Sequence, residues 1–321
     1  YYTVHRYLLG DYRPYIYRTD DYGESWALLT PGDNGIPEDW PARVTREDPD
    51  REGLLYAGTE FGMFISFDNG ENWQPFQLNM ANVPINDIQI HNGDMLIATQ
   101  GRAMWSLDNL SALHQISPEM RVADAHLYAP RDGYRTTAAP QILGPNIDYY
   151  LPSPPSGTVT VDILDASGTT VNSYSSGAMP RQGGGGFFGR RGPPPPTVTT
   201  NVGHNRMVWN VQDQDGLTMP PGRYQARLTV EGRSQAQPFN VLIDPRVAAR
   251  GVTMTDLAEL YEHNRTMNAM VAEVGALVER VRTAQESGDD NLRRRLDPLA
   301  ERLITGPIRY SQPGLQTHIT Y

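Results

Sequence analysis

The chain has 321 residues, which is enough for about two or three domains of ordinary size. Its 37 acidic residues exceed its 27 basic ones, and the net charge of −10 argues against a general nucleic-acid binder, because phosphate contacts need clustered cations. The absence of cysteine excludes cysteine nucleophiles, thiolate metal sites and disulfides. No stretch reaches the roughly 18–20 apolar residues that span a bilayer, so we expect no membrane anchor and no signal peptide in this sequence.

All 27 basic residues are arginine, and two interpretations are open. A GC-rich genome produces this bias without selection on the protein. Selection for a guanidinium-rich surface that pairs bidentately with a partner's carboxylates would also produce it. The sequence starts inside an expected strand without a methionine and stops at Tyr321 within an apolar run, so we expect both ends to lie inside a longer protein.

Residues 1–117 contain a repeated motif. Ser or Thr is followed by Asp, Gly and Trp at fixed spacing, and the two complete copies are Thr19–Trp26 and Ser66–Trp73. A degraded third copy is Ser106–Asn109, and the strand expected before a copy also recurs, as Leu55–Thr59 and Leu96–Gln100. A period of about 40–50 residues with short alternating strands is typical of β-propeller blades. We therefore predict partial propeller blades over residues 1–117.

The composition of this motif fits a hairpin turn. The Asp carboxylate can accept backbone N–H bonds across the turn. Gly supplies a backbone angle that a Cβ would forbid, and Trp packs under the turn and anchors it between strands. We therefore predict structural rather than catalytic roles for Asp21, Gly23, Trp26, Asp68, Gly70 and Trp73.

Both complete copies resemble Asp-box (BNR) repeats, as in sialidases and sortilin-type propellers. More of the chain is similar to large secreted bacterial proteins of the BNR-repeat glycosyl hydrolase group. The matching runs are Leu54–Gly62, Thr99–Arg102, Trp105–Asp108, Asp244–Arg246 and Tyr310–Tyr321, although that group more usually has His where Gln100 stands. The resemblance covers almost the whole chain but only about the C-terminal third of such a protein. It implies a periplasmic or extracellular location.

A second β-domain is expected over residues 147–246, after a connector at 118–146. Strands are predicted at Thr158–Leu164, Val171–Tyr174, Met207–Val211, Arg223–Val230 and Gln237–Ile243. About five to seven short strands in roughly 100 residues are typical of an immunoglobulin-like sandwich. The turn Pro220–Tyr224 with the preceding Trp209 resembles FlgD-type or fibronectin-like modules of secreted bacterial proteins.

This domain contains a loop rich in Gly and Pro at 177–197. One interpretation is a long hairpin loop folded back on its own sandwich. The other is a contact element ordered by a partner protein, presenting Phe187, Phe188, Arg190 and Arg191. We carry the second as the partner-binding hypothesis.

A helical hairpin and tail are predicted over residues 252–321. Thr253 and Asp256 form a capping box, and apolar residues from Leu257 to Val281 then recur at helical spacing. Residues 287–290 end this helix and cap a second one, which is expected to run to Thr305.

No catalytic constellation or cofactor site emerges from the sequence. A sialidase needs an arginine cluster, a Tyr/Glu pair and an acid, and the candidates for these are Arg43, Arg46, Arg102, Tyr56 and Glu60. The seven histidines are scattered, without metal-ligand spacing on a helix face.

We therefore expect a non-catalytic structural or interaction module outside the cytoplasm, with no cofactor, no bound metal and no transmembrane segment. Its partners would be other protein chains, for example in a photosynthetic or respiratory membrane complex, with this chain as an accessory subunit on the outer face. The alternative is the C-terminal fragment of a secreted, sialidase-like BNR-repeat glycoside hydrolase.

Overall fold

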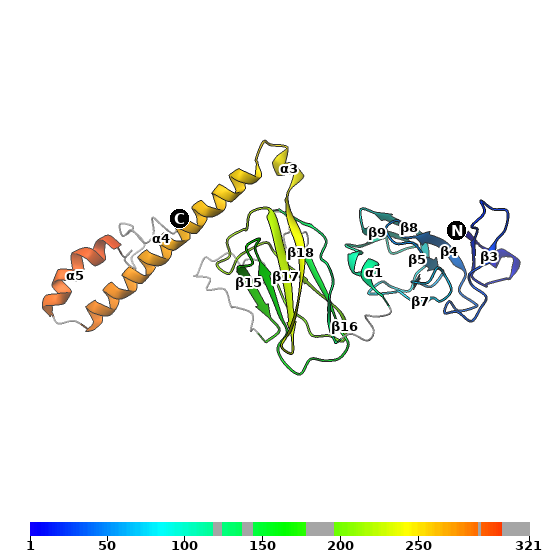
Figure 1. Cartoon of the computed structure of the whole chain (residues 1–321), viewed down its shortest axis with the longest axis horizontal. Coiled ribbons are helices and arrows are strands. Elements are labelled where there is room, and N and C mark those ends of the chain that lie inside the picture. Colours follow the sequence, from blue (N-terminus) through cyan, green and yellow to red (C-terminus); the bar gives the residue numbers. More distant parts are fainter. Residues whose placement is uncertain (118–123, 137–143, 178–195, 288–289, 304–321) are drawn as a thin grey trace.

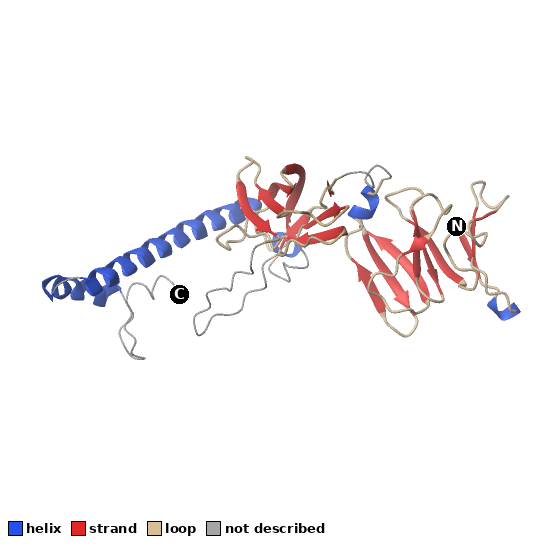
Figure 2. Cartoon of the chain, turned by 90° about the horizontal axis from the view of Figure 1, so that it is seen from below, coloured by secondary structure: helices blue, strands red, loops and turns tan. Residues whose placement is uncertain are grey.

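The computed structural model describes residues 1–117, 124–136, 144–177, 196–287 and 290–303. An N-terminal β region, a central β region and a long helix follow one another along the longest axis of the molecule (Figure 1). Strands dominate, and the long helices lie at the C-terminal end (Figure 2). The predicted fold class, mainly β with a helical C-terminal part, is confirmed. In the described part of the chain, no helix combines the length and the apolar character needed to cross a membrane.

The N-terminal β region contains three antiparallel sheets, each built from strands that are neighbours in the sequence. The first sheet has β1 (Tyr2–Val4), β2 (Tyr15–Arg18) and β3 (Ala27–Leu28). The second has β4 (Ala42–Glu47), β5 (Leu55–Thr59), β6 (Met63–Ser66) and β7 (Gln74–Pro75). The third has β8 (Ile85–His91), β9 (Asp94–Thr99) and β10 (Met104–Leu107). Two short helices flank these sheets, η1 (Tyr7–Leu9) and α1 (Ser111–Gln115).

The second sheet lies between the other two, because its strands contribute to two separate cores. Leu55 and Ala57 of β5 join a core with Ile16 of β2, whereas Tyr56 joins another with Ile88 of β8. Side chains of a strand alternate between the two faces, so a strand covered on both sides is buried throughout, as β5 is. This stacking of small antiparallel sheets is compatible with propeller blades, and the propeller itself stays a prediction.

The close contact between the second and third sheets depends on a glycine. A Cβ at Gly58 would lie 2.6 Å from Ile85 Cγ2 and 2.7 Å from Val44 Cγ1. Both neighbours are β-branched and buried, so they cannot move aside. Gly58 therefore sets the spacing between these sheets.

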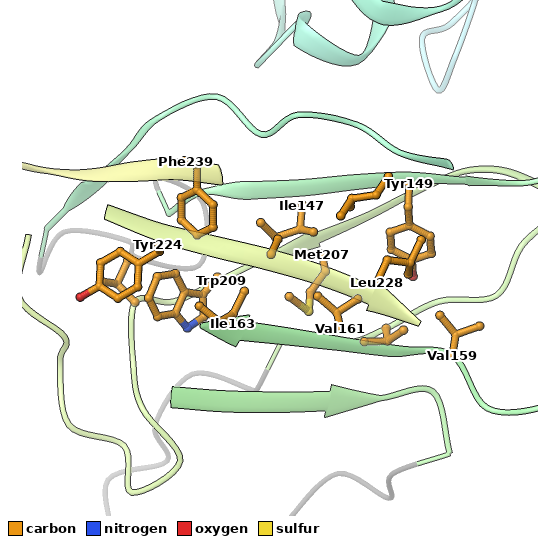
Figure 3. Packing of buried hydrophobic residues seen from close by; sticks show 14 of the residues in the cluster. Ile147, Tyr149, Val159, Val161, Ile163, Met207, Trp209, Tyr224, Leu228 and Phe239 are labelled. Atoms are coloured by element: carbon orange, nitrogen blue, oxygen red, sulfur yellow. The ribbon is translucent and has the colours of Figure 1, made fainter. Parts of the chain in front are cut away.

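The central β region contains two sheets that share one core. The fourth sheet has β11 (His126–Leu127), β13 (Asn146–Leu151) and β16 (Gly203–Val208). The fifth sheet has, in spatial order, β12 (Gly133–Arg135), β18 (Arg233–Ile243), β17 (Gly222–Val230), β14 (Thr160–Leu164) and β15 (Thr170–Ser175). Trp209, Tyr224 and Phe239 gather at one end of the shared core (Figure 3), where the Trp209 and Tyr224 ring centroids are 5.2 Å apart. The immunoglobulin-like assignment of these sheets stays a prediction.

Two features of this region differ from the sequence expectation. The segment expected to be a connector supplies β11 and β12 to the two sheets, and β12 pairs in parallel with β18. Strands of two or three residues are too short to show a period-two pattern, so their pairing is not visible in the sequence. The strand expected at Met207–Val211 is instead Gly203–Val208, and the chain turns away at Val211, which has φ of 57°.

The C-terminal part contains α3 (Pro245–Ala248), α4 (Met254–Ser287) and α5 (Asp290–Leu303). The capping box is present, since Asp256 Oδ2 accepts the backbone N–H of Thr253 at 2.8 Å and Thr253 Oγ1 accepts the N–H of Asp256 at 3.2 Å. Helix α5 packs back on the far end of α4, where Leu303 contacts the cluster of Val278 and Val281. The residues expected to extend this helix to Thr305 lie outside the described ones.

Candidate functional site

The first Asp box is a self-contained hydrogen-bonded turn. Asp21 accepts three hydrogen bonds, from the Ser25 N–H at 2.9 Å, the Ser25 hydroxyl at 2.6 Å and the Thr19 hydroxyl at 2.7 Å. Thr19 Oγ1 in turn accepts the N–H of Gly23 at 2.7 Å. The bonds from Ser25 and Thr19 lower the pKa of Asp21 to about 2, because they favour the charged carboxylate. The carboxylate of Asp21 is therefore engaged by its own turn.

The second box repeats this arrangement bond for bond. Asp68 accepts the N–H of Asn72 at 2.9 Å, the Asn72 side-chain amide at 2.8 Å and the Ser66 hydroxyl at 2.7 Å. Ser66 Oγ accepts the N–H of Gly70 at 2.9 Å. Partial burial opposes ionisation of Asp68, but the bonds from Asn72 and Ser66 outweigh it and lower the pKa. The two box carboxylates thus occupy equivalent places in equivalent turns.

The two box tryptophans differ in their surroundings. Trp73 is 5% exposed and lies in the core between the first and second sheets, and its indole N–H donates to the Leu29 carbonyl at 3.2 Å. Trp26 is 48% exposed, and its indole N–H donates to the carbonyl of Gly23 in its own turn at 3.2 Å. Only the second tryptophan connects its turn to a neighbouring sheet.

The residues considered for sialidase chemistry lie in separate local pairs. Arg43 donates to Glu60 at 2.7 Å and also to Asn86. Arg46 pairs with Asp87 at 2.7 Å. Each of these arginines already has a carboxylate partner within the protein, which leaves its charge balanced.

The other two candidates for this chemistry differ in burial. Tyr56 is fully buried, and its hydroxyl donates to Asp48 at 2.9 Å. Burial and the neighbouring Asp48 carboxylate raise its pKa far above the usual range, which is unsuited to a nucleophile. Arg102 is exposed at the end of the third sheet.

The structure brings together one group of potential metal ligands that the sequence analysis did not identify. One ligand atom each of Asp48, Asp50 and His114 lies within 4.8 Å of the others. His114 is far from the two aspartates along the chain, so only the fold reveals the group. The buried Asp48 carboxylate already interacts with His114 Nε2 at 2.9 Å and accepts the Asp50 N–H at 2.9 Å. The Asp48 carboxylate is thus occupied by contacts within the protein, and we assign this group a structural role.

The predicted partner-binding residues, Phe187, Phe188, Arg190 and Arg191, lie outside the described residues. A different apolar surface is present on α4. It consists of four exposed side chains that fall within a sector of about 100° on the helix, given about 3.6 residues per turn. We call it the α4 stripe, and its members are Leu260, Met267, Met270 and Leu277. Helix α5 covers only the C-terminal end of this side of α4, around Val278 and Val281.

Comparison with known proteins does not place this chain in a family. No protein-family model matches it, and no curated protein matches it. Among solved structures, it is similar to PorZ, a bacterial surface component of the type-IX secretion system of Porphyromonas gingivalis, with 13% identity over 71% of this chain and 25% of that one, and a TM-score of 0.24.

Two further solved structures show a similar degree of likeness. One is the extracellular domain of the putative one-component system BT4673 from B. thetaiotaomicron, with 10% identity, coverage of 75% of this chain and 34% of that one, and a TM-score of 0.24. The other is the BSP domain of a biofilm-associated protein, with 10% identity, 59% and 22% coverage, and a TM-score of 0.20. This chain spans at most about a third of the length of each of the three. Likenesses at this level carry no argument about its function.

Proposed function

We propose that this chain is a non-catalytic interaction module that works outside the cytoplasm. In this proposal residues 1–117 are blades of an Asp-box propeller, 147–246 an immunoglobulin-like sandwich and 252–321 a helical hairpin with its tail. The module binds other protein chains. The observation that carries the proposal is the α4 stripe, a row of large apolar side chains left open to water on a helix that projects from the β regions (Figure 1).

The stripe has the character of a helix-binding surface. Leu260, Met267 and the partly buried Val274 recur every seven residues, the spacing at which one side of a helix meets a partner helix. The same side of α4 already receives a helix at its far end, where Val278 and Val281 are buried against Leu303 of α5. Covering the open part would remove further apolar surface from water, at about 25 cal/mol per Å².

The state of the charged groups supports a non-catalytic role. The two box carboxylates are engaged in their turns, and Arg43 and Arg46 are each paired with a carboxylate. Recognition of an anionic sugar by an arginine cluster that includes Arg43 or Arg46 would require breaking at least one of these pairs. The sialidase-like alternative is therefore the weaker candidate.

A location outside the cytoplasm is supported by the resemblance of the boxes to those of secreted proteins. Docking on the outer face of a membrane complex is the specific form that we propose. The loop residues Phe187 and Phe188, with Arg190 and Arg191, would add a second contact in that form.

Site-specific photo-cross-linking tests the proposed surface. A photoreactive phenylalanine replaces Met267 in the stripe or, as a control, Ala269, which is also exposed but lies on the opposite side of α4. After irradiation of cells that make the protein, we expect a discrete cross-linked species from position 267 and none from position 269. Equal yields at the two positions, or none at either, would contradict the proposal.

Enzyme assays test the other half of the proposal. We expect no turnover of sialosides or other glycosides by the full chain. Turnover that is abolished by Arg102→Ala would establish the glycosidase alternative.

A parallel comparison of cross-linking with and without residues 183–192 then tells whether the loop contributes to binding.

A further inference from the structure

The degraded third box differs from the other two in how its turn is held. Ser106 still donates to Asp108, as in a complete box, and Asn109 takes a left-handed conformation with φ of 66°. The glycine and the tryptophan of the complete boxes are absent from this copy. In the first two boxes the tryptophan follows three residues after the glycine and packs within the N-terminal β region. The third turn is held within this region by hydrogen bonds to Gly93 and Asp94, and it receives further contacts from outside the region.

Arg206 of β16, in the central β region, reaches the third turn. Its Nη1 donates to the carbonyl oxygen of Asp108 at 3.0 Å, and its Nη2 donates to that of Asn109 at 3.2 Å. Asp108 and Asn109 are almost a hundred positions away from Arg206 in the sequence. A guanidinium group is suited to this contact because it offers five N–H donors in one plane.

The position of this guanidinium group is fixed by Asp148. Arg206 stands directly opposite Asp148 on β13, and its Nε and Nη2 donate to the two carboxylate oxygens at 2.7 and 3.1 Å. Asp148 is buried, and its Oδ1 also lies 2.9 Å from His204 Nε2. Burial of Asp148 opposes ionisation, but the bonds from His204 and Arg206 outweigh it and lower the pKa of this carboxyl. The bidentate pair is therefore formed at neutral pH, and it orients the remaining donors toward the third turn.

A second arginine binds the neighbouring turn between β8 and β9, which is hydrogen-bonded to the third turn. Arg131, between β11 and β12, donates through Nη1 to the Asn92 carbonyl at 2.9 Å and to Asp94 Oδ1 at 2.8 Å. The same Asp94 oxygen accepts the backbone N–H of Asn109 at 2.8 Å. Two arginines of the central β region thus contact two adjacent turns of the third sheet, and Asp94 connects these turns to each other.

A reciprocal amide contact lies beside these arginines. Gln115 at the end of α1 donates to the Ala129 carbonyl at 3.0 Å and accepts the Ala129 N–H at 2.7 Å. Both groups of contacts join residues before 117 to residues after 124.

We propose that the degraded third box is a joint that locks the two β regions into one rigid body. Arg131 and Arg206 replace the missing tryptophan of the box and hold the central β region in a single orientation against the third sheet. The joint consists of Asp94, Asp108, Asn109, Arg131, Arg206 and Asp148. It does not depend on which partner the chain binds, and it assigns a function to the third copy of the motif that the propeller pattern alone does not give.

Distance measurement between spin labels tests this joint in the full chain. The chain has no cysteine, so Gln89→Cys on β8 and Thr170→Cys on β15 provide one exposed label in each β region without further changes. In the otherwise unchanged protein we expect one narrow distance distribution. In the Arg131→Met/Arg206→Met double variant we expect a distribution at least twice as wide.

The control is a matched pair inside the central β region. Arg227 stands opposite Asp162 and binds it through two N–H donors at 3.1 and 2.8 Å, as Arg206 binds Asp148, but it has no part in the joint. We expect Arg227→Met to leave the distribution unchanged. A double variant as narrow as the unchanged protein, or an equal widening in the control, would overturn the proposal.

Loss of Arg206 leaves the Asp148 carboxylate buried beside His204, which can unfold the central β region. The Arg131→Met variant then serves as the test by itself, because its partner Asp94 is more than a third exposed and stays solvated. We expect its distribution to widen by at least half while the circular dichroism spectrum is retained. A distribution of unchanged width in this variant would also overturn the proposal.

Discussion

The first and second Asp boxes have the same hydrogen bonds but different environments. In both, the Asp carboxylate accepts a backbone N–H four residues ahead, and the Ser or Thr oxygen accepts the N–H of the glycine. The turn of the second box contacts Leu29, which directly follows β3 of the first sheet, through Trp73. The turn of the first box ends in a half-exposed Trp26, whose ring meets the exposed Tyr2 edge-on, with centroids 6.1 Å apart.

The difference separates two levels of structure. The hydrogen bonds that the two turns share all lie within eight residues, and the second turn also accepts bonds from Asn34 and donates one to Gly53. The contribution of the tryptophan to stability is determined by the neighbouring sheet, which the motif does not specify. The motif thus predicts the turn correctly at both places, whereas the predicted anchoring by tryptophan is found for Trp73 and is wrong for the half-exposed Trp26.

The largest expected difference between the boxes comes from removing the tryptophans. Trp73→Ala should cost about 3–5 kcal/mol, because it opens a cavity between the first and second sheets. Trp26→Ala should cost less than about 1 kcal/mol, as is usual for exposed positions. Hydrogen exchange of the β5 amides at increasing denaturant measures both values, and similar costs at the two positions would show that burial does not distinguish the boxes.

A smaller difference is expected from the glycines. Gly23 and Gly70 both have positive φ, 98° and 87°, where a side chain is strained. A Cβ at Gly70 would also lie 2.8 Å from Leu29 Cδ1, whereas at Gly23 the nearest atom is 3.7 Å away. We expect Gly23→Ala to cost about 1–2 kcal/mol and Gly70→Ala about 1 kcal/mol more. Thermal unfolding of the two variants followed by circular dichroism checks this order, and a larger loss in Gly23→Ala would contradict it.

The smallest expected effect is on the stability of the protein at acidic pH. The pKa of Asp21 is about 2 in the folded protein against 3.8 for the free group, so its ionised form stabilises the turn. This contribution is complete above about pH 4 and is lost as the pH falls through 2. Asp21→Asn keeps one acceptor oxygen but does not titrate, so its stability should fall less between pH 4 and pH 2 than that of the unchanged protein. Urea unfolding at the two pH values measures the difference, and identical losses would show that Asp21 titrates normally.

Local features of the fold were predictable from the sequence. The strand Leu55–Thr59 has the expected bounds, because a short apolar run flanked by turn residues indicates a buried strand. The capping box at Thr253 is likewise encoded within four residues. Features that join distant segments were not predictable. The parallel pairing of β12 with β18 and the contact of His114 with Asp48 depend on which segments the completed fold brings together.

The exposed part of the α4 stripe could likewise not be predicted from the sequence alone. The period of α4 predicts which side chains share a face, but it does not predict how far α5 covers that face. That extent follows from the length of α5 and from where the chain reverses, so the exposed members of the stripe emerge only from the packed helices.

Helix α4 also determines how far apart the ends of the molecule stand. Its second turn is attached to the central β region, where the Tyr261 hydroxyl donates to Asp213 at 2.9 Å. The whole helix has 34 residues, and the part from Tyr261 to Ser287 extends for about 40 Å, at roughly 1.5 Å per residue. A protein bound at the tip of the hairpin would thus be held at a nearly constant distance from the sandwich, as by a rigid spacer arm.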